Sequence, residues 1–317
     1  ELVYFFFSFY SNFSNEETCV MFDTHPTITE NYFGGMFSLI AFGVQPSYEH
    51  FNWSLAPLAN KEKAKTGEGI ALSSRLTEIF KSHNIRCALA PSPVMFNSAI
   101  APRQLLLQPE NNMLAGNTCA LYRGVFADGV ELVGDTTNEA FVMSSADCAL
   151  IVVRWNNRLW AMHAGRNSLL DIAMINDPSS TPTKVHASVI DSVMSQIPSE
   201  HHKEVEVFVG LTISKGSHFV HSINHPEYGE SNRNMIAWLA CEYSPPPEKG
   251  FGDDFWIDGQ FSMEWLIREQ FKTYGVTDIT FDGRCTFSDK DSRGGYLWHS
   301  QRREKNKRNL VIVRRNW

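Results

Sequence analysis

No stretch of this sequence approaches the roughly 18 to 20 uninterrupted apolar residues that a membrane-spanning helix needs, so no membrane span is expected. Positive charge is not in excess either: 28 Lys and Arg stand against 35 Asp and Glu, a formal net charge of −7, which argues against a nucleic-acid partner. The six cysteines lie at long, irregular intervals without a CxxC pair, so the pattern indicates neither a disulfide framework nor a zinc ribbon. The sequence also contains no internal repeat or low-complexity tract.

The first residues are apolar but do not resemble a secretory signal. The run at 2–7 lacks a basic segment before it and a small-residue cleavage site after it. Together with the cysteine pattern, this favours a cytoplasmic protein. We interpret residues 1–29 as an N-terminal aromatic arm, which either packs on the domain as an edge strand or contacts a protein partner, and residues 30–317 as one domain.

Apolar residues make up 43% of the 317 positions and charged residues 20%, which is enough for a globular core. Apolar residues at helical spacing predict helices over 70–80, 185–197 and 261–274. Runs of β-branched and aromatic residues predict strands over 141–153, 158–163, 205–210, 277–281 and 309–313. The polar runs at 60–69 and 244–250 are interpreted as surface loops. The predicted fold class is α/β (α+β), a single-domain mixed β-sheet sandwich with flanking helices.

Two neighbouring apolar runs predict a β-hairpin that carries a cysteine and a histidine. They are joined at Asn156-Asn157, residues that tolerate the positive φ of a tight turn. With those two residues as the turn, paired positions sum to 313, so Leu150 lies opposite His163, and Cys148 lies two residues away on the same strand. Side chains alternate between faces, so Cys148 and His163 share one face, with β-carbons roughly 7 Å apart. A thiolate and an imidazole at that distance can contact each other or share a metal, whereas inert packing is the alternative.

Several sequence blocks, taken in order, resemble the motifs of the laccase-domain family, also called YfiH/YlmD-like or polyphenol-oxidase-like. Ala146-Asp147-Cys148 and His163-Ala164-Gly165 are similar to its "ADC" and "HAG" motifs. Further blocks resemble its "iGPsI", "CTy", "hSyRR" and "gRnlvvv" segments, at residues 209–213, 284–287, 299–304 and 308–313. The resemblance covers residues 70–314, and the shared order is more specific than any single block.

The resemblance implies a YfiH-type enzyme whose site lies beside the hairpin. Members of the family carry a His-Cys-His cluster that can hold zinc, and they act on purine nucleosides by phosphorolysis, with phosphate as co-substrate, and by deamination of adenosine; an older label is copper-dependent oxidation of phenols. Carried over residue by residue, Cys148 and His163 match two ligands of the cluster. Arg75 matches the arginine of the family's "NR" helix and would contact phosphate or nucleoside. Arg302 and Arg303 match a C-terminal arginine pair, for which phosphate binding and a structural role both stay open.

Two positions depart from the family's pattern. Asn97 stands where the family has the histidine of its "QvH" motif, and Arg166-Asn167 replace the Trp and Arg that follow "HAG". A thiolate, an imidazole and a neutral amide oxygen form a poor zinc shell. Cys148 and His163 are therefore candidate metal ligands that lack a third strong donor, and we expect weak zinc binding or none. Asn97 becomes a candidate substrate-binding residue, together with the arginine pair.

Three classes of function stay open. The first is a purine nucleoside phosphorylase or adenosine deaminase, in which Arg75 holds phosphate while Cys148 and His163 position the nucleoside or a water. The second is a Cys-His thiol hydrolase or deamidase, because a thiolate beside an imidazole is the minimum for nucleophilic catalysis. This pair resembles that of cytotoxic-necrotizing-factor toxins, in which the histidine also follows the cysteine by fifteen residues. The third is a catalytically degenerate protein that serves as a binding or scaffold protein.

Overall fold

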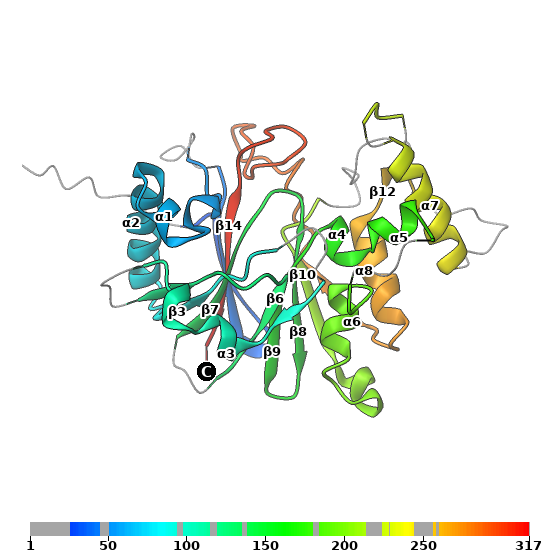
Figure 1. Cartoon of the computed structure of the whole chain (residues 1–317), viewed down its shortest axis with the longest axis horizontal. Coiled ribbons are helices and arrows are strands. Elements are labelled where there is room, and N and C mark those ends of the chain that lie inside the picture. Colours follow the sequence, from blue (N-terminus) through cyan, green and yellow to red (C-terminus); the bar gives the residue numbers. More distant parts are fainter. Residues whose placement is uncertain are drawn as a thin grey trace, which may run out of the picture.

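Two six-stranded sheets pack face to face in the computed structural model of the chain, with helices on both outer sides (Figure 1). The residues that the structure describes are 26–44, 51–93, 98–114, 119–134, 138–179, 184–213, 224–227, 229–243, 256–257 and 260–316. In sheet order, the first sheet contains β1 (Ile28–Tyr32), β2 (Phe37–Phe42), β14 (Asn309–Arg315), β7 (Glu139–Ser145), β3 (Cys87–Leu89) and β5 (Ala120–Tyr122). The second contains β13 (Asp278–Phe281), β10 (Glu206–Gly210), β8 (Ala149–Trp155), β9 (Arg158–Ala164), β6 (Gly129–Leu132) and β4 (Ile100–Ala101).

Both sheets are mixed. In the first, β3 runs parallel to β7 and β5, and the other neighbours are antiparallel. In the second, the outer pairs β13–β10 and β6–β4 are parallel around an antiparallel centre. A separate pair is formed by β11 (Trp256–Ile257) and β12 (Gln260–Phe261).

Helices cover the outer face of each sheet (Figure 1). Beside the first sheet lie α1 (Lys61–Ala64) and α2 (Gly67–Ser82), and α3 (Arg103–Leu106) is a single turn further along the chain. Beside the second sheet lie α4 (Arg166–Leu169), α5 (Ile172–Asn176), α6 (Val189–Met194), α7 (Gly229–Glu242) and α8 (Met263–Lys272). Short 3-10 turns occupy Phe33–Gly35, Ala56–Leu58, Pro109–Asn111 and Ser199–Glu204. No helix of the described residues is both long and apolar enough to cross a membrane.

Three layers of buried side chains fill the spaces between these four layers of structure. Strand β8 contributes to two of them, because its side chains alternate: Leu150 and Val152 face the first sheet, and Ile151 and Val153 face the helices. A strand buried on both faces is an uninterrupted apolar run, as the sequence here is. The predicted sandwich of mixed sheets with flanking helices is confirmed.

The prediction of one long strand over 141–153 is wrong in detail. The run forms two strands, β7 in the first sheet and β8 in the second, separated by a turn at Asp147. Asp147 has φ +80°, in the left-handed region that aspartate tolerates better than most residues. A chain with this backbone leaves one sheet and enters the other.

The helix predictions hold for α2 and α8 and need correction elsewhere. The helix predicted over 185–197 is shorter, since α6 begins at Val189, and Val185 is 94% exposed. The polar run 60–69 is not wholly a loop, because it contains α1 and the start of α2, capped by the side chains of Asn60 and Thr66. Residues 1–25 and 244–250 lie outside the described residues, so the aromatic arm and the second loop stay predictions.

The carboxylate of Asp147 joins the segments that surround the crossing between the sheets. Its Oδ1 accepts a hydrogen bond from Thr286 Oγ1 at 2.6 Å, and its Oδ2 accepts from Ser300 Oγ at 2.9 Å and from the Arg302 backbone N–H at 3.3 Å. Its main-chain carbonyl accepts from Thr212 Oγ1 at 3.1 Å. These bonds connect the end of β10, the residues after β13 and the residues before β14.

Asp147→Ala should therefore lower the free energy of unfolding by about 3 kcal/mol, because it leaves buried donors unpaired and places a β-carbon with no hydrogen-bonding group at a positive φ. Asp147→Asn, which keeps one acceptor oxygen and tolerates the backbone, should cost less. Urea unfolding of the two variants measures both values. Equal stability of the alanine variant and the native protein would contradict this role.

Candidate active site

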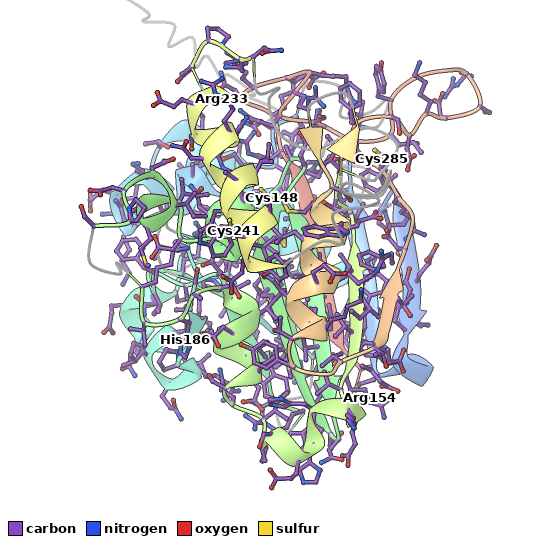
Figure 2. The ribbon with its side chains drawn as sticks, turned by 90° about the vertical axis from the view of Figure 1, so that its right-hand side faces the viewer. Cys148, Arg154, His186, Arg233, Cys241 and Cys285 are labelled. Atoms are coloured by element: carbon purple, nitrogen blue, oxygen red, sulfur yellow. The ribbon has the colours of Figure 1, made fainter. Side chains whose placement is uncertain are left out.

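The hairpin that carries the cysteine and the histidine has the predicted register. Leu150 pairs with His163 and Trp155 pairs with Arg158, so paired positions sum to 313. Asn156 adopts φ +53°, as the turn requires. Cys148 directly precedes β8, opposite Gly165 in the same register. Figure 2 shows Cys148 beneath the helices that cover this side of the molecule.

The side chains of Cys148 and His163 converge on Gly165. A β-carbon added at Gly165 would lie 3.0 Å from Cys148 Sγ, 3.2 Å from His163 Cε1 and 3.7 Å from His163 Nε2. The sulfur and the Nε2 side of the ring therefore border the same small space, which any larger residue at 165 would fill. Cys148 is half-buried, and the His163 side chain is 15% exposed. The pair lies at the edge of the core rather than inside it.

A third side chain, Asp128, lies on the other side of the imidazole. It precedes β6, and its carbonyl accepts the backbone N–H of His163 at 2.7 Å. Its Oδ1 is 3.5 Å from His163 Nδ1, slightly beyond a good hydrogen bond, and Nδ1 has no closer acceptor. A small rotation of the ring would close this contact. Cys148, His163 and Asp128 thus form a row in the order thiol, imidazole, carboxylate.

The electrostatics of the row favour a protonated imidazole. Burial by itself would lower the pKa of His163, but the negative charge of Cys148 and the contact with Asp128 raise the pKa above its ordinary value. A thiol beside an imidazole can pass its proton to the ring when it attacks a substrate. The arrangement can therefore supply a nucleophile together with an acid.

A chain of hydrogen bonds supports Asp128 from behind. Ser168 Oγ donates to Asp128 Oδ1 at 2.5 Å, Ser98 Oγ donates to the Ser168 carbonyl at 3.0 Å, and Lys184 Nζ donates to Ser98 Oγ at 2.8 Å. Lys184 Nζ also donates to the carbonyls of Asn167 and Leu170. Burial lowers the pKa of Lys184, and nearby Asp171 and Asp128 oppose that effect. These bonds fix α4 and Asp128 relative to the hairpin.

The predicted arginines occupy different places. The backbone N–H of Arg302 donates to Asp147, the residue before Cys148, and its exposed side chain places the guanidinium 5.2 Å from the centre of the Phe287 ring. Arg303 instead donates to the main-chain carbonyls of Thr286, Phe287 and Trp298, which is a structural role.

Arg75 lies on α2, where its guanidinium stacks 3.7 Å from the centre of the Phe51 ring. Helix α2 packs on the outer face of the first sheet, whereas Cys148 and His163 share the face that points between the sheets. The structure does not bring Arg75 to the pair. Asn97 lies outside the described residues, and its predicted contribution stays a prediction.

The described residues do not fit a zinc ion. No group of three or more His, Cys, Asp and Glu side chains among them is arranged to hold a metal. Asp128 faces Nδ1, on the far side of the ring from Cys148, so it cannot join Cys148 and Nε2 in one shell. Two donors are fewer than the three protein ligands of a catalytic zinc site.

Asp128 and Lys184 were not identified from the sequence. Asp128 precedes a short apolar strand, but only the pairing of β6 with β9 places it beside His163. Lys184 reaches Ser98 across 86 positions of the chain. No local sequence pattern predicts the contact of Asp128 with His163 or that of Lys184 with Ser98.

Replacing His163 tests whether the pair is a functional unit. His163→Gln should slow alkylation of Cys148 by iodoacetamide at pH 7 about tenfold, because it removes the imidazolium beside the sulfur. Mass spectrometry of the Cys148 peptide gives the rate, with the exposed Cys241 as the internal reference. Equal rates in both proteins would contradict the pairing.

The role of Asp128 has a separate readout. Because the carboxylate helps to raise the pKa of His163, Asp128→Asn should lower the midpoint of the His163 titration by about one pH unit. The Cε1–H resonance of the imidazole reports that midpoint in an NMR titration. Asp278→Asn, at an exposed site on β13, is the matched control and should leave it unchanged. A midpoint that moves equally in both variants would exclude this role.

Solved structures of other proteins share this architecture. The Neisseria meningitidis protein NMB0706, described by the family model DUF152, aligns with a TM-score of 0.54 and 16% identity over 91% of this chain and 98% of its own. The Bacillus licheniformis hypothetical protein YfiH aligns with a TM-score of 0.53 and 11% identity, over 87% and 92% of the two chains. YlmD from Geobacillus stearothermophilus aligns with a TM-score of 0.51 and 15% identity, over 89% and 92%. No family model and no curated protein matches the sequence. The chain therefore has the fold of the DUF152, YfiH and YlmD proteins, as its sequence motifs predicted.

Proposed function

We propose that the protein is an enzyme that uses the Cys148 thiolate as its nucleophile, with His163 as general acid and base and Asp128 orienting the imidazole. The observation that carries this proposal is the row of side chains: sulfur and Nε2 border one space at Gly165, and a carboxylate faces Nδ1. A nucleophile, a base within reach and a third group that orients the base are the parts of a catalytic triad. The reaction class is hydrolysis or deamidation of an acyl compound.

The reaction divides into two steps in which every proton is accounted for. The thiolate attacks the carbonyl carbon, the C–N or C–O bond breaks, and the leaving group takes its proton from the His163 imidazolium, which leaves a thioester on Cys148. The neutral imidazole then takes a proton from water, and the resulting hydroxide attacks the thioester carbon. The C–S bond breaks, the acid is released, and the thiolate and imidazolium are restored.

Phosphorolysis or deamination of purine nucleosides is the second candidate. Two observations favour it: the fold shared with YfiH and YlmD, and the Cys148–His163 pair, whose sequence resembles the family's motifs. In this reaction phosphate would attack the anomeric carbon, and the imidazolium would donate a proton to the departing base. Because Arg75 lies beyond the first sheet, the phosphate would need another arginine, and Arg302 and Arg166 are the described candidates by their places in the chain, next to the Asp147 contact and next to Gly165.

One pair of assays separates the two candidates. The thiolate enzyme should hydrolyse p-nitrophenyl acetate, and Cys148→Ala should reduce kcat/KM about a thousandfold, because the nucleophile is lost. Cys241→Ala, at an exposed cysteine on α7, is the matched control and should retain full activity.

The second assay mixes inosine or adenosine with phosphate and measures free base. Phosphate-dependent base release without ester hydrolysis would replace the first candidate with the second. Hydrolysis of the ester at the same rate by Cys148→Ala would exclude Cys148 as the nucleophile. No turnover in either assay, with stable capture of a protein partner, would instead favour a scaffold.

A further inference from the structure

A pocket of about 520 Å³ lies among the helices on the outer side of the second sheet. Its walls come from α4 and α5, the segment 184–188, the first turn of α6, the end of α7 and the end of α8. In Figure 2, His186 marks this region and is well separated from Cys148. The volume is within the range of small-molecule sites, about 300 to 1,000 Å³.

Aromatic rings form one wall of this pocket. Trp238, Tyr243 and Tyr274 all line it. The rings of Trp238 and Tyr243 meet nearly perpendicularly with centroids 6.5 Å apart, and Trp265 supports Tyr243 from behind at 5.6 Å. Trp238 is 37% exposed, so part of the wall faces the opening. The faces of such rings carry negative potential and attract cations.

Carboxylates give the same pocket a negative charge. Asp171, Asp191 and Glu242 line it, and Asp191 Oδ1 accepts the Tyr274 hydroxyl at 2.6 Å. Burial, together with Glu242, raises the pKa of Tyr243 to about 12, and burial and Asp191 raise the pKa of Tyr274 as well. Both phenols therefore stay neutral at pH 7.

The cationic groups of the lining are already bound. Lys184 donates its ammonium hydrogens to Ser98 and to two carbonyls, and the His186 ring lies 3.2 Å from Asp191 Oδ2. Three carboxylates outnumber these two groups in the lining, so its formal charge is negative.

A buried amide provides an acceptor at this site. Gln270 lines the pocket and is 7% exposed. Its Nε2 donates to the Leu169 carbonyl at 2.6 Å, which fixes the direction of the amide and leaves Oε1 without a hydrogen-bond donor. An unpaired buried oxygen costs free energy that a ligand N–H would recover.

We propose that this pocket binds a small organic ammonium ion, a primary or secondary amine that carries an apolar group. The apolar group packs on Trp238 and Tyr243, the charge lies near the carboxylates, and an N–H group donates to Gln270 Oε1. The site is distinct from the Cys148 row and does not depend on the proposed reaction.

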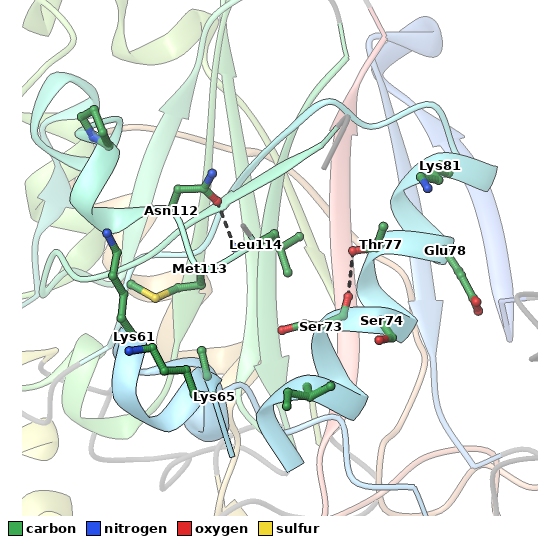
Figure 3. A pocket seen from close by; sticks show the side chains of 13 residues that line it. Lys61, Lys65, Ser73, Ser74, Thr77, Glu78, Lys81, Asn112, Met113 and Leu114 are labelled. Carbon is green, nitrogen blue, oxygen red and sulfur yellow. Dashed lines mark hydrogen bonds between the residues drawn. The ribbon is translucent and has the colours of Figure 1, made fainter. Parts of the chain in front are cut away.

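A pocket of opposite charge lies on the other side of the molecule. It occupies about 660 Å³ beside α2, and Figure 3 shows Lys61, Lys65 and Lys81 around it, with Glu78 at the rim. A ligand selected by charge should therefore enter only one of the two pockets. This contrast defines the choice of probes.

Three probes of one shape test the proposal: 2-phenylethylamine, a cation at pH 7; 2-phenylethanol, which is neutral; and phenylacetate, an anion. Isothermal titration calorimetry on the full chain should show binding of the amine, at least about tenfold weaker binding of the alcohol, and none of the carboxylate at this site. Binding of all three with similar affinity, or of none, would overturn the proposal.

Matched variants on one helix locate the amine. Glu242→Gln, at the pocket, should weaken its binding severalfold, whereas Glu230→Gln, exposed at the other end of α7, should not. Trp238→Ala, at a partly exposed position that does not threaten folding, should weaken binding at least tenfold. Unchanged affinity in both Glu242→Gln and Trp238→Ala would exclude this pocket as the site. Because calorimetry requires no turnover, these outcomes are independent of the reaction at Cys148.

Discussion

The buried carboxylate of Asp147 is the constraint on which the rest of the structure depends. The chain leaves the first sheet and enters the second at this residue, and the donors to its two oxygens come from the connection between β13 and β14, along which the chain returns to the first sheet. A buried carboxylate without such partners would cost several kcal/mol, so the donors and the turn are retained together. Cys148 is the next residue. The bonds that join the sheets therefore also fix the position of Cys148, directly before β8.

The same alternation that builds the core also delivers the reactive side chains. On β8, Leu150 and Val152 fill the space between the sheets, and Cys148 is the next position on that face. His163 follows Leu159 and Ala161 on the paired strand in the same way. The row thus lies where the core ends, with Cys148 half-buried and the His163 side chain 15% exposed, so charges there interact more strongly than in water. Gly165 leaves the space that both side chains border.

The sequence predicted the hairpin and its shared face because both depend on neighbours in the chain: a two-residue turn and a period of two. It did not predict the break at Asp147, since no glycine or proline marks it and both flanking strands are buried on two sides. The sequence did not indicate a role for Asp128, because its partner His163 lies 35 positions further along the chain, on β9. Arg75 matched a motif, but α2 places it behind the first sheet. Local patterns fix strands and turns, whereas a site assembled across strands depends on which strands become neighbours.

The two nitrogens of His163 bear differently on the chemistries that the motifs left open. A carboxylate behind Nδ1 suits a metal ligand and a general base equally well, because in both cases it orients the ring and holds a proton on Nδ1. The difference lies on the Nε2 side, where a metal needs an unprotonated nitrogen and further donors. Among the described residues the only reactive atom identified there is the Cys148 sulfur, and the charge of that sulfur favours a proton on the ring. A proton and a metal compete for the same lone pair on Nε2, so metal binding at this pair should fall as the pH drops below the pKa of His163.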